Sequence, residues 1–364
     1  MFSKKNRVLV LMSGGVDSSV TALLLKNRGF DVTGVTMVLF NDDNSKIIEN
    51  KNVSDAKLVA KILNINHVTL DLRKKFKENV IDYFVDEYLN GRTPNPCVMC
   101  NKCIKFGVMF SFAKENGFNY IASGHYAHIF YSKDVEDWIL EKSPTKKDQS
   151  YVLYNLKQED LKHILLPLWN MEKSDVRNIA KEYNLPVAQK KESQEICFIK
   201  DNDYTSFIKR RCSKIKTGNF IDIRGNVLGK HEGIINYTIG QRKGLGITFG
   251  KPMYVTNINN LDSTVTLGEK SELCSKGLIA KNVNVISEKL LPLGKYIDAS
   301  VKLRYKSSEI DSTLIVKKSD SNTREITCKV TFKEPTFCSV TAGQSVVFYK
   351  NNIVLGGGVI CSRF

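Results

Sequence analysis

Nine cysteines occur in this chain, and four of them stand where thiols can do chemistry: Cys97, Cys100, Cys103 and Cys197. The first three form a C-x-x-C-x-x-C run at the expected start of a helix. Because helix starts and nearby cations lower a thiol pKa, we expect a nucleophilic thiolate in this run, helped by Lys102 and Lys105. The remote fourth cysteine permits a relay, in which one thiol carries a labile sulfur and the other resolves it as a disulfide. The other five have no partner spacing and are interpreted as structural or incidental thiols.

A second stretch suited to chemistry, Ser13-Gly14-Gly15-Val16-Asp17-Ser18-Ser19, lies between an apolar run and an amphipathic segment closed by Gly29. This order predicts a strand, a glycine turn and a helix. Glycines let the backbone approach an anion, and the helix start directs N–H groups and its positive dipole end at a phosphate. The stretch has no lysine before its serine pair and lacks the Walker A spacing, which argues against ordinary γ-phosphoryl transfer. It resembles the PP-loop of ATP pyrophosphatases, in which an acceptor oxygen attacks the α-phosphorus of ATP.

The elements that must position these residues begin with alternating strand and helix patterns, typical of a parallel doubly wound sheet. We expect strands at 8–12, 31–40, 67–72, 120–123 and 195–199. We also expect Ser54 to cap a helix over 55–63 and Ser174 to cap one over 175–183. The fold class predicted for the N-terminal part is therefore α/β.

From about Lys214 glycines become frequent and short runs alternate with period two, which predicts an all-β remainder. Apolar residues at 297, 299, 301, 303 and 305 share one face of a strand, and 326, 328, 330 and 332 repeat the pattern. Asn351-Asn352 reads as a hairpin turn, because Asn tolerates positive φ. We expect a catalytic α/β domain over 1–205, a small β-rich central domain over 206–275 and a C-terminal β-barrel over 276–364.

Composition limits the class of protein. The 364 residues, 42% of them hydrophobic, suffice for two or three domains with cores. The net charge of +16 and pI near 9.3 indicate a polyanionic partner, for which nucleic acid is the leading candidate. Residues 1–7 are polar and no apolar run approaches membrane-spanning length, so we expect a cytoplasmic enzyme with no membrane partner.

Several motifs together resemble one family. In chain order they are the PP-loop, Asn95-Pro96 with Cys100-Asn101, Gly124-His125-Tyr126-Ala127, Lys147-Asp148-Gln149-Ser150-Tyr151, the Cys197 segment, and the glycine-spaced basic loop 237–246. The chain resembles the bacterial tRNA-specific 2-thiouridylases over essentially its full length.

This resemblance implies a two-step reaction at uridine 34 of the tRNAs for lysine, glutamate and glutamine. ATP with Mg²⁺ adenylates the C2 oxygen, pyrophosphate leaves, and sulfur then replaces AMP. Cys197 would carry a persulfide received from a cysteine desulfurase or sulfur-relay protein. Cys100 would attack that persulfide to free hydrosulfide, or resolve it as a disulfide.

The resemblance also implies roles for individual positions. The ATP-binding residues would be Met12, Ser13, Gly14, Gly15, Val16, Asp17, Ser18, Ser19, Met37 and Gly124, with Asp17 helping to organise Mg²⁺. The target base would meet Asn95, Pro96 and Cys97. Further tRNA contacts would come from His125, Lys147, Asp148, Gln149, Arg304, Tyr305 and Gln344. Outside the family context, the alternative interpretation is a core or loop histidine for His125 and a solvated charge cluster for the Lys147 segment. Tyr305 could equally be a packing residue.

Cys97 departs from the family pattern, because many members carry an acid/base Asp there. The resulting C-x-x-C-x-x-C spacing also occurs in iron–sulfur ligation. An alternative mechanism therefore has Cys97, Cys100 and Cys197 holding a [4Fe-4S] cluster whose open iron binds hydrosulfide, with Cys103 as a fourth ligand or a plain helix residue. Two other classes stay open: a PP-loop ligase acting on a small molecule, and a non-catalytic tRNA-binding protein.

Overall fold

The computed structural model describes residues 6–40, 51–191, 196–199, 202–212, 215–247, 250–318 and 325–364. They divide into two compact units of interleaved sequence. The first unit comprises Met1–Val80, Cys97–Gln194 and Asn352–Val354, and the second comprises Ile81–Pro96, Glu195–Asn351 and Leu355–Phe364.

A parallel sheet in the order β3-β2-β1-β4-β7 forms the centre of the first unit. The strands are β1 (Arg7–Leu11), β2 (Asp31–Val38), β3 (Asn66–Asp71), β4 (Tyr120–Ala122) and β7 (Ile164–Leu165). Their continuous apolar runs suit strands that are buried on both faces. Because β1 lies between β2 and β4 and pairs in parallel with both, the chain winds outward in both directions from it. This confirms the predicted doubly wound α/β fold.

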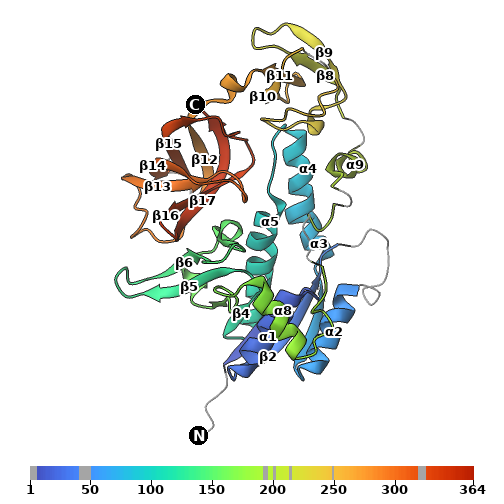
Figure 1. The fold of residues 1–364 in the computed structure, drawn as a ribbon, viewed down its shortest axis with the longest axis vertical. Coiled ribbons are helices and arrows are strands. Elements are labelled where there is room, and N and C mark those ends of the chain that lie inside the picture. The colour runs from blue at the N-terminus through green and yellow to red at the C-terminus, as the bar shows by residue number, and fades with distance from the viewer. Residues whose placement is uncertain are drawn as a thin grey trace. The chain divides into compact units, whose positions relative to one another are not determined.

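Helices α1 (Val16–Asn27) and α2 (Lys51–Ile62) pack against this sheet, and α8 (Lys173–Glu182) packs against α1, as Figure 1 shows. They share one hydrophobic core with the strands, in which Val10, Val20, Val59 and Val176 are 0% exposed. This core fixes the end of β1 and the start of α1, and the PP-loop joins the two.

Three local predictions are wrong. Helix α2 already contains Lys51, and the Ser54 hydroxyl donates to the Lys51 carbonyl inside the helix instead of capping it. Helix α8 is capped by Glu172 in a capping box with Asp175, so Ser174 lies inside the first turn. Residues 196–199 form a turn and not a strand, while residue 195 lies outside the described residues.

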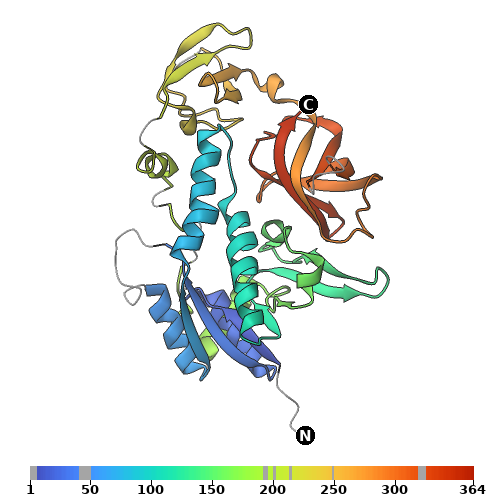
Figure 2. The same ribbon diagram turned by 180° about the vertical axis from the view of Figure 1, so that it is seen from behind.

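One continuous helix carries the cysteine run. It consists of α5 (Pro96–Met99), the π-helical segment η3 (Cys100–Val108) and α6 (Met109–Glu115), which run together in teal in Figure 2. Segments of π-helix are uncommon and recur at functional sites. The remaining elements of this unit are α3 (Arg73–Phe76), the hairpin β5 (Ala127–Ser132) and β6 (Asp137–Lys142), η4 (Ser150–Leu153) and α7 (Gln158–Leu161), while η2 (Lys77–Ile81) leads into the second unit.

The second unit begins with α4 (Asp82–Leu89) and also contains α9 (Tyr204–Lys209). A small sheet follows in the order β10-β11-β8-β9, built from β8 (Gly218–Ile221), β9 (Val227–His231), β10 (Tyr254–Asn259) and β11 (Thr264–Gly268). Two short helical turns, η5 (Ile234–Asn236) and η6 (Lys270–Leu273), flank it. Its own core includes Phe220, Val255 and Leu267, each at most 1% exposed.

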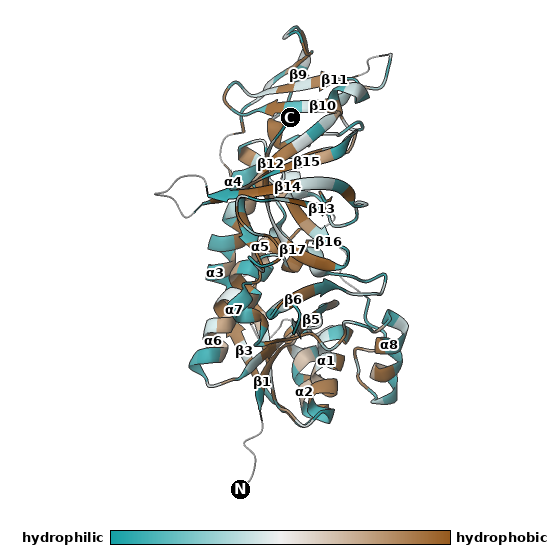
Figure 3. Ribbon diagram, turned by 90° about the vertical axis from the view of Figure 1, so that its left-hand side faces the viewer, coloured by the Kyte–Doolittle hydropathy of each residue, from teal (hydrophilic) through white to brown (hydrophobic). Residues whose placement is uncertain are grey.

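The C-terminal strands close into a barrel. They are β12 (Ser275–Val285), β13 (Tyr296–Lys302), β14 (Ile310–Lys318), β15 (Ile326–Thr336), β16 (Ser345–Lys350) and β17 (Ile353–Arg363), in the order β12-β15-β14-β13-β16-β17. Pairing of β12 with β17 completes the ring. Figure 3 shows hydrophobic residues in brown along β16 and β17, whose side chains fill the core.

Two barrel predictions can be compared directly with the structure. Asn351 has φ +55° between β16 and β17, which confirms the hairpin turn. Strand β13 ends at Lys302, so the alternation predicted as far as Tyr305 stops early, and the Tyr305 side chain is exposed and does not pack in the barrel core. Among the described helices, none is long and apolar enough to span a bilayer.

Candidate active site

Hydrogen bonds made by its own serines stabilise the conformation of the PP-loop. The Ser18 hydroxyl accepts from the Ser13 backbone N–H at 3.1 Å and donates to the Gly15 carbonyl at 3.2 Å. The Ser19 hydroxyl donates to the same carbonyl at 2.8 Å. The N-cap residue of α1 is Gly15, which makes no side-chain cap hydrogen bond, so among the described residues the first N–H groups of this helix stay available to an anion.

Two glycines allow other segments to approach this loop. Gly14 has φ +68°, and a Cβ atom there would collide with the Asn52 carbonyl of α2. A Cβ atom on Gly124 would stand 3.0 Å from the Ser18 nitrogen and 2.9 Å from the Asp17 carbonyl carbon. The structure thus brings Gly124 against the PP-loop. Met37 lies at the carboxyl end of β2, next to β1.

Two lysines that sequence reasoning missed reach the loop. The Lys173 ammonium lies 2.6 and 2.7 Å from the two carboxylate oxygens of Asp17, and the Tyr126 hydroxyl donates to that carboxylate at 2.8 Å. The Lys190 ammonium donates to the Gly14 carbonyl at 2.9 Å. Each lysine is more than 150 positions from its loop partner, so no motif spacing could have indicated it.

Burial contradicts the thiolate predicted for the cysteine run. Cys100 is 8% exposed, and burial raises its thiol pKa, although Lys105 lowers it in part. Burial also raises the pKa of Cys103. Cys97 has an exposed side chain, yet surrounding protein atoms desolvate the thiol enough to raise its pKa as well. In this conformation the desolvation outweighs the helix dipole and the lysines.

Next to Cys100, only one of the two polar atoms of the Asn101 side-chain amide has a hydrogen-bond partner among the described residues. Its nitrogen donates to the Val152 carbonyl at 3.2 Å. Its buried oxygen has no hydrogen-bond partner among the described residues. An unpaired buried polar atom costs about 1–3 kcal/mol, so this side chain holds the helix to η4 at an energetic cost.

His125 is a buried, neutral histidine. Burial lowers its pKa well below the usual value, and Lys105 acts in the same direction. Its Nε2 lies 3.5 Å from the Lys105 ammonium, which can only donate, so the ring hydrogen belongs on Nδ1, 2.6 Å from the Ser123 hydroxyl. His125 therefore sits in the core beside the Gly124 segment, and its predicted tRNA contact stays a prediction.

This burial predicts a pH-dependent stability. The unfolded chain protonates His125 near pH 6.5 and the folded chain does not, so folding stability is lost as the pH falls below 6.5. Between pH 7.5 and 5.5 we expect the His125→Gln variant to lose about 1 kcal/mol less stability than the wild type in urea denaturation. His67 and His231 also have lowered pKa values, but they contribute equally to both proteins. An equal pH dependence in the two proteins would contradict a neutral buried His125.

The Lys147 segment is an ordered turn. The Asp148 carboxylate accepts hydrogen bonds from the Ser143 and Ser150 N–H groups at 3.0 and 3.1 Å. Gln149 and Tyr126 exchange two hydrogen bonds, one of them between backbone groups at 2.7 Å. Asp148 and Gln149 therefore shape the turn instead of forming a loose solvated cluster, and Lys147 is held beside them.

In the second unit, an aromatic cluster anchors the turn that carries Cys197. Phe198 is 3% exposed, and its ring centroid lies 5.4 Å from that of Phe84 on α4 and 5.2 Å from that of Phe207 on α9. Ile199 is buried as well. Because its neighbours are fixed in this way, Cys197 projects from a supported turn with an exposed side chain.

The chain just before Asn95 is bound to the barrel. Gln344 donates from its amide to the Thr93 carbonyl at 3.0 Å, and the Thr93 N–H donates to the Ala342 carbonyl at 2.9 Å. Gln344 thus positions the segment that leads into Asn95 and Pro96. Arg304 donates to the Thr341 hydroxyl at 3.1 Å, which places it at the same barrel loop.

The predicted residues therefore gather in two places. Those assigned to ATP, with His125 and Cys100, lie in the first unit, whereas Asn95, Cys197 and the barrel residues belong to the second. Among the described residues, no group of three or more His, Cys, Asp or Glu side chains is placed to hold a metal ion. The cysteine run by itself therefore does not form a ready cluster site.

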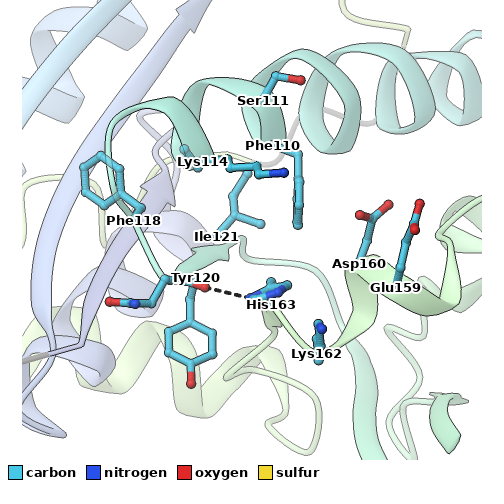
Figure 4. A pocket seen from close by; sticks show the side chains of 12 residues that line it. Phe110, Ser111, Lys114, Phe118, Tyr120, Ile121, Glu159, Asp160, Lys162 and His163 are labelled. Atoms are coloured by element: carbon cyan, nitrogen blue, oxygen red, sulfur yellow. Dashed lines mark hydrogen bonds between the residues drawn. The ribbon is translucent and has the colours of Figure 1, made fainter.

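A cavity of about 490 Å³ lies elsewhere in the first unit (Figure 4). It is lined by Tyr120, Asp160 and His163 among others, and His163 is paired through Nδ1 with the Asn119 carbonyl at 3.0 Å. Tyr120 begins β4, whereas the PP-loop follows the carboxyl end of the parallel strand β1. The cavity contains none of the predicted site residues.

Family models match three consecutive parts of the chain. They are described as a tRNA methyl transferase HUP domain over residues 6–201, a tRNA methyl transferase PRC-barrel domain over 205–269, and an aminomethyltransferase beta-barrel domain over 275–360. Fold and site together define a PP-loop protein with two appended β domains.

Curated relatives specify the family. The tRNA-specific 2-thiouridylase MnmA of Clostridioides difficile is 49% identical over 367 residues, which cover 99% of each chain. MnmA 1 of Caldanaerobacter subterraneus is 49% identical over 364 residues, which cover 98% of each chain. The chain belongs to the tRNA-specific 2-thiouridylase MnmA family. Membership of this PP-loop family implies ATP with Mg²⁺ as the cofactors.

Solved structures are more distant. A 4-thiouridine synthetase in an RNA complex with bound ATP is 18% identical, with a TM-score of 0.37 over 53% of this chain and 45% of that chain. The U34-tRNA thiolase NcsA from Methanococcus maripaludis with its [4Fe-4S] cluster is 18% identical, with a TM-score of 0.33 over 57% of this chain and 65% of that chain. At these scores neither structure informs the site of this chain.

Proposed function

We propose that this protein is a cytoplasmic tRNA-uridine 2-sulfurtransferase that converts uridine 34 of the tRNAs for lysine, glutamate and glutamine to 2-thiouridine. The observation that carries the proposal is the open PP-loop, with the α1 N–H groups uncapped by Gly15 and Gly124 packed against it, in a chain that matches a curated member of this family over 99% of both lengths. The net charge of +16 suits a tRNA partner.

The first step is adenylation. The N–H groups at the start of α1 would hold the phosphates, and Mg²⁺, when bound, would supply positive charge beside them. The C2 oxygen of the uridine attacks the α-phosphorus, and pyrophosphate leaves. The PP-loop stays rigid because Ser18 and Ser19 hold its Gly15 carbonyl, so its donors are already oriented when the charge develops.

The second step is sulfur transfer. Cys197, which is exposed on its anchored turn, receives a terminal sulfur from a sulfur donor and becomes a persulfide. The Cys100 thiolate attacks the inner sulfur of this persulfide, which forms a Cys100–Cys197 disulfide and releases hydrosulfide. Hydrosulfide adds to C2 and AMP leaves. A thiol reductant must then supply two electrons to regenerate both thiols.

Because burial raises the Cys100 pKa, this step needs a change at the site. A tRNA bound along the segment from Asn95 to Cys97 would reach the start of the same helix. We propose that this contact brings Cys100 together with Cys197 and assists loss of its proton. Lys105 is the nearby cation that lowers the Cys100 pKa, so it would stabilise the thiolate once the site opens.

Recognition of tRNA is proposed for the remaining positions. Asn95, Pro96 and Cys97 would contact the target base, with Gln344 holding the segment before them. His125, Lys147, Asp148, Gln149, Arg304 and Tyr305 would contact the tRNA more widely. Exposed Tyr305 offers a ring for stacking on a base.

One experiment tests the reaction and its alternatives. The purified protein is incubated with unmodified tRNA, ATP, Mg²⁺, cysteine and a cysteine desulfurase, and nucleosides and AMP are measured by mass spectrometry. We expect one AMP for each 2-thiouridine. AMP formation that does not depend on tRNA would indicate a small-molecule ligase, and tRNA binding without pyrophosphate release would indicate a non-catalytic binder.

Iron and sulfide analysis of protein purified without oxygen separates the two sulfur routes. A colourless, iron-free and fully active protein supports the persulfide route. Activity that follows the iron content, and is lost on removing iron, would instead support a cluster held by Cys97, Cys100 and Cys197.

A further inference from the structure

A lysine from far along the chain pairs with the first turn of α1. Lys173 is the first residue of α8, and its side chain is 14% exposed. Its ammonium contacts both carboxylate oxygens of Asp17, the second residue of α1. The cation therefore stands beside the helix start that is open to an anion.

Lys190 occupies a different position at the same loop. Its ammonium donates to the Gly14 carbonyl and the Asn52 amide oxygen, both at 2.9 Å, and to the Asp55 carboxylate at 2.5 Å. These three acceptors use all three of its N–H groups. Lys190 thus fixes the loop against α2 and has no donor left for a ligand.

We propose that Lys173 is a nucleotide-binding residue. Its ammonium binds the β- and γ-phosphates of ATP and, after the reaction, the pyrophosphate. Lys190 instead holds the PP-loop in the conformation that binds these phosphates. This inference rests on the proposed function, because it assumes that ATP binds at the PP-loop.

The first argument is charge. The loop itself contains no lysine, unlike a Walker A loop, whose lysine reaches the β- and γ-phosphates. The α1 dipole supplies only about half a positive charge. Among the described residues, the two lysines that contact the loop are paired with Asp17 and Asp55, so opening one of these pairs would give a polyphosphate a full cation.

The second argument concerns which lysine can exchange its present partner for a phosphate. Lys190 would have to leave three partners from two segments, whereas Lys173 already faces the Asp17 carboxylate in the first turn of α1, beside the anion site. A flexible four-carbon side chain can cross from a carboxylate to a phosphate without movement of α8. The Asp17 carboxylate would keep its hydrogen bond from Tyr126 and could offer its other oxygen to Mg²⁺. The ion pair with Asp17 would be replaced by an ion pair with a phosphate.

The test compares a ligand that carries the β- and γ-phosphates with one that lacks them. Binding of α,β-methylene-ATP and of AMP, both with Mg²⁺, is measured by calorimetry on the full chain. For Lys173→Gln we expect the affinity for the ATP analogue to fall roughly 10- to 100-fold, because a charged hydrogen bond is lost. We expect AMP affinity within about threefold of wild type. Lys190→Gln should weaken both ligands, because the whole loop loses its support.

The matched control is Lys181→Gln, an exposed lysine of the same helix, which should bind both ligands as the wild type does. Equal losses for the two ligands in Lys173→Gln, or no loss, would mean that Lys173 only joins α8 to α1, and the inference fails. If that variant does not fold, Lys173→Arg keeps the ion pair. Its different donor geometry should still change the ratio of the two affinities at least about threefold, and an unchanged ratio overturns the inference. A wild type that binds no ATP analogue would instead contradict the proposed function.

Discussion

Replacing Cys197 by Ser should abolish 2-thiouridine formation, with a loss on the order of 10³-fold or more, because a hydroxyl cannot carry a transferable sulfur. Affinity for tRNA should stay within about twofold of wild type, because contacts with the phosphate backbone dominate such binding. Thiolation is measured by mass spectrometry of nucleosides, and affinity by filter binding at fixed salt. The turn should survive the change, since Phe198 and Ile199 anchor it and the Cys197 side chain is exposed.

Cys100→Ser should stop thiolation to the same extent, but the protein should end in a different chemical state. The sulfur donor still loads Cys197, and no thiol frees the sulfur, so a persulfide should accumulate that is visible as one extra sulfur in the intact mass. Cys338→Ser, an exposed cysteine of the second unit, and Cys103→Ser, in the same helix as Cys100, serve as matched controls and should thiolate normally. Thiolation retained in both the Cys100 and the Cys197 variants would refute the assignment of the two sulfur-handling residues.

The first sheet was predictable because its strands are buried on both faces. Such strands appear in the sequence as continuous apolar runs, and Val8, Leu9 and Val10 are completely buried. The residues at which helices begin were harder to predict from the sequence. Ser174 is a common capping residue type, yet Glu172 and Asp175 cap each other at that position. The choice among neighbouring capping residues depends on the backbone geometry, which composition does not fix.

The chemistry of the site was only partly predictable. The PP-loop is local in sequence, so its conformation follows from a few adjacent residues. The Cys100 pKa depends instead on tertiary burial, which reverses the effect expected from the helix dipole. Lys173, Lys190 and Gln344 act on segments more than 150 positions away, so only the folded chain reveals their partners.

The loop conformation itself predicts different outcomes for two adjacent glycines. Gly14→Ala should lower the free energy of unfolding by about 2–4 kcal/mol, because φ +68° strains an L-residue and its Cβ would collide with the Asn52 carbonyl. Gly15→Ala should cost about 1 kcal/mol or less, because Gly15 has φ −103° and its Cβ would lie 3.4 Å from the Ser13 hydroxyl, an ordinary contact. Urea denaturation of the nucleotide-free protein measures both values.

Binding of α,β-methylene-ATP should then distinguish a loop that has lost its conformation from a loop in which a methyl group blocks the phosphates. In Gly14→Ala the affinity should fall together with stability, because displacement of Asn52 also disturbs the Lys190 contacts that hold the loop. In Gly15→Ala the affinity should fall while stability is kept, since the new methyl group stands at the uncapped start of α1, where the phosphates must approach. Wild-type stability in Gly14→Ala would show that the loop does not need a left-handed residue. Wild-type affinity in Gly15→Ala would show that the phosphates do not lie against this helix start, and the adenylation site would have to be sought elsewhere in the first unit.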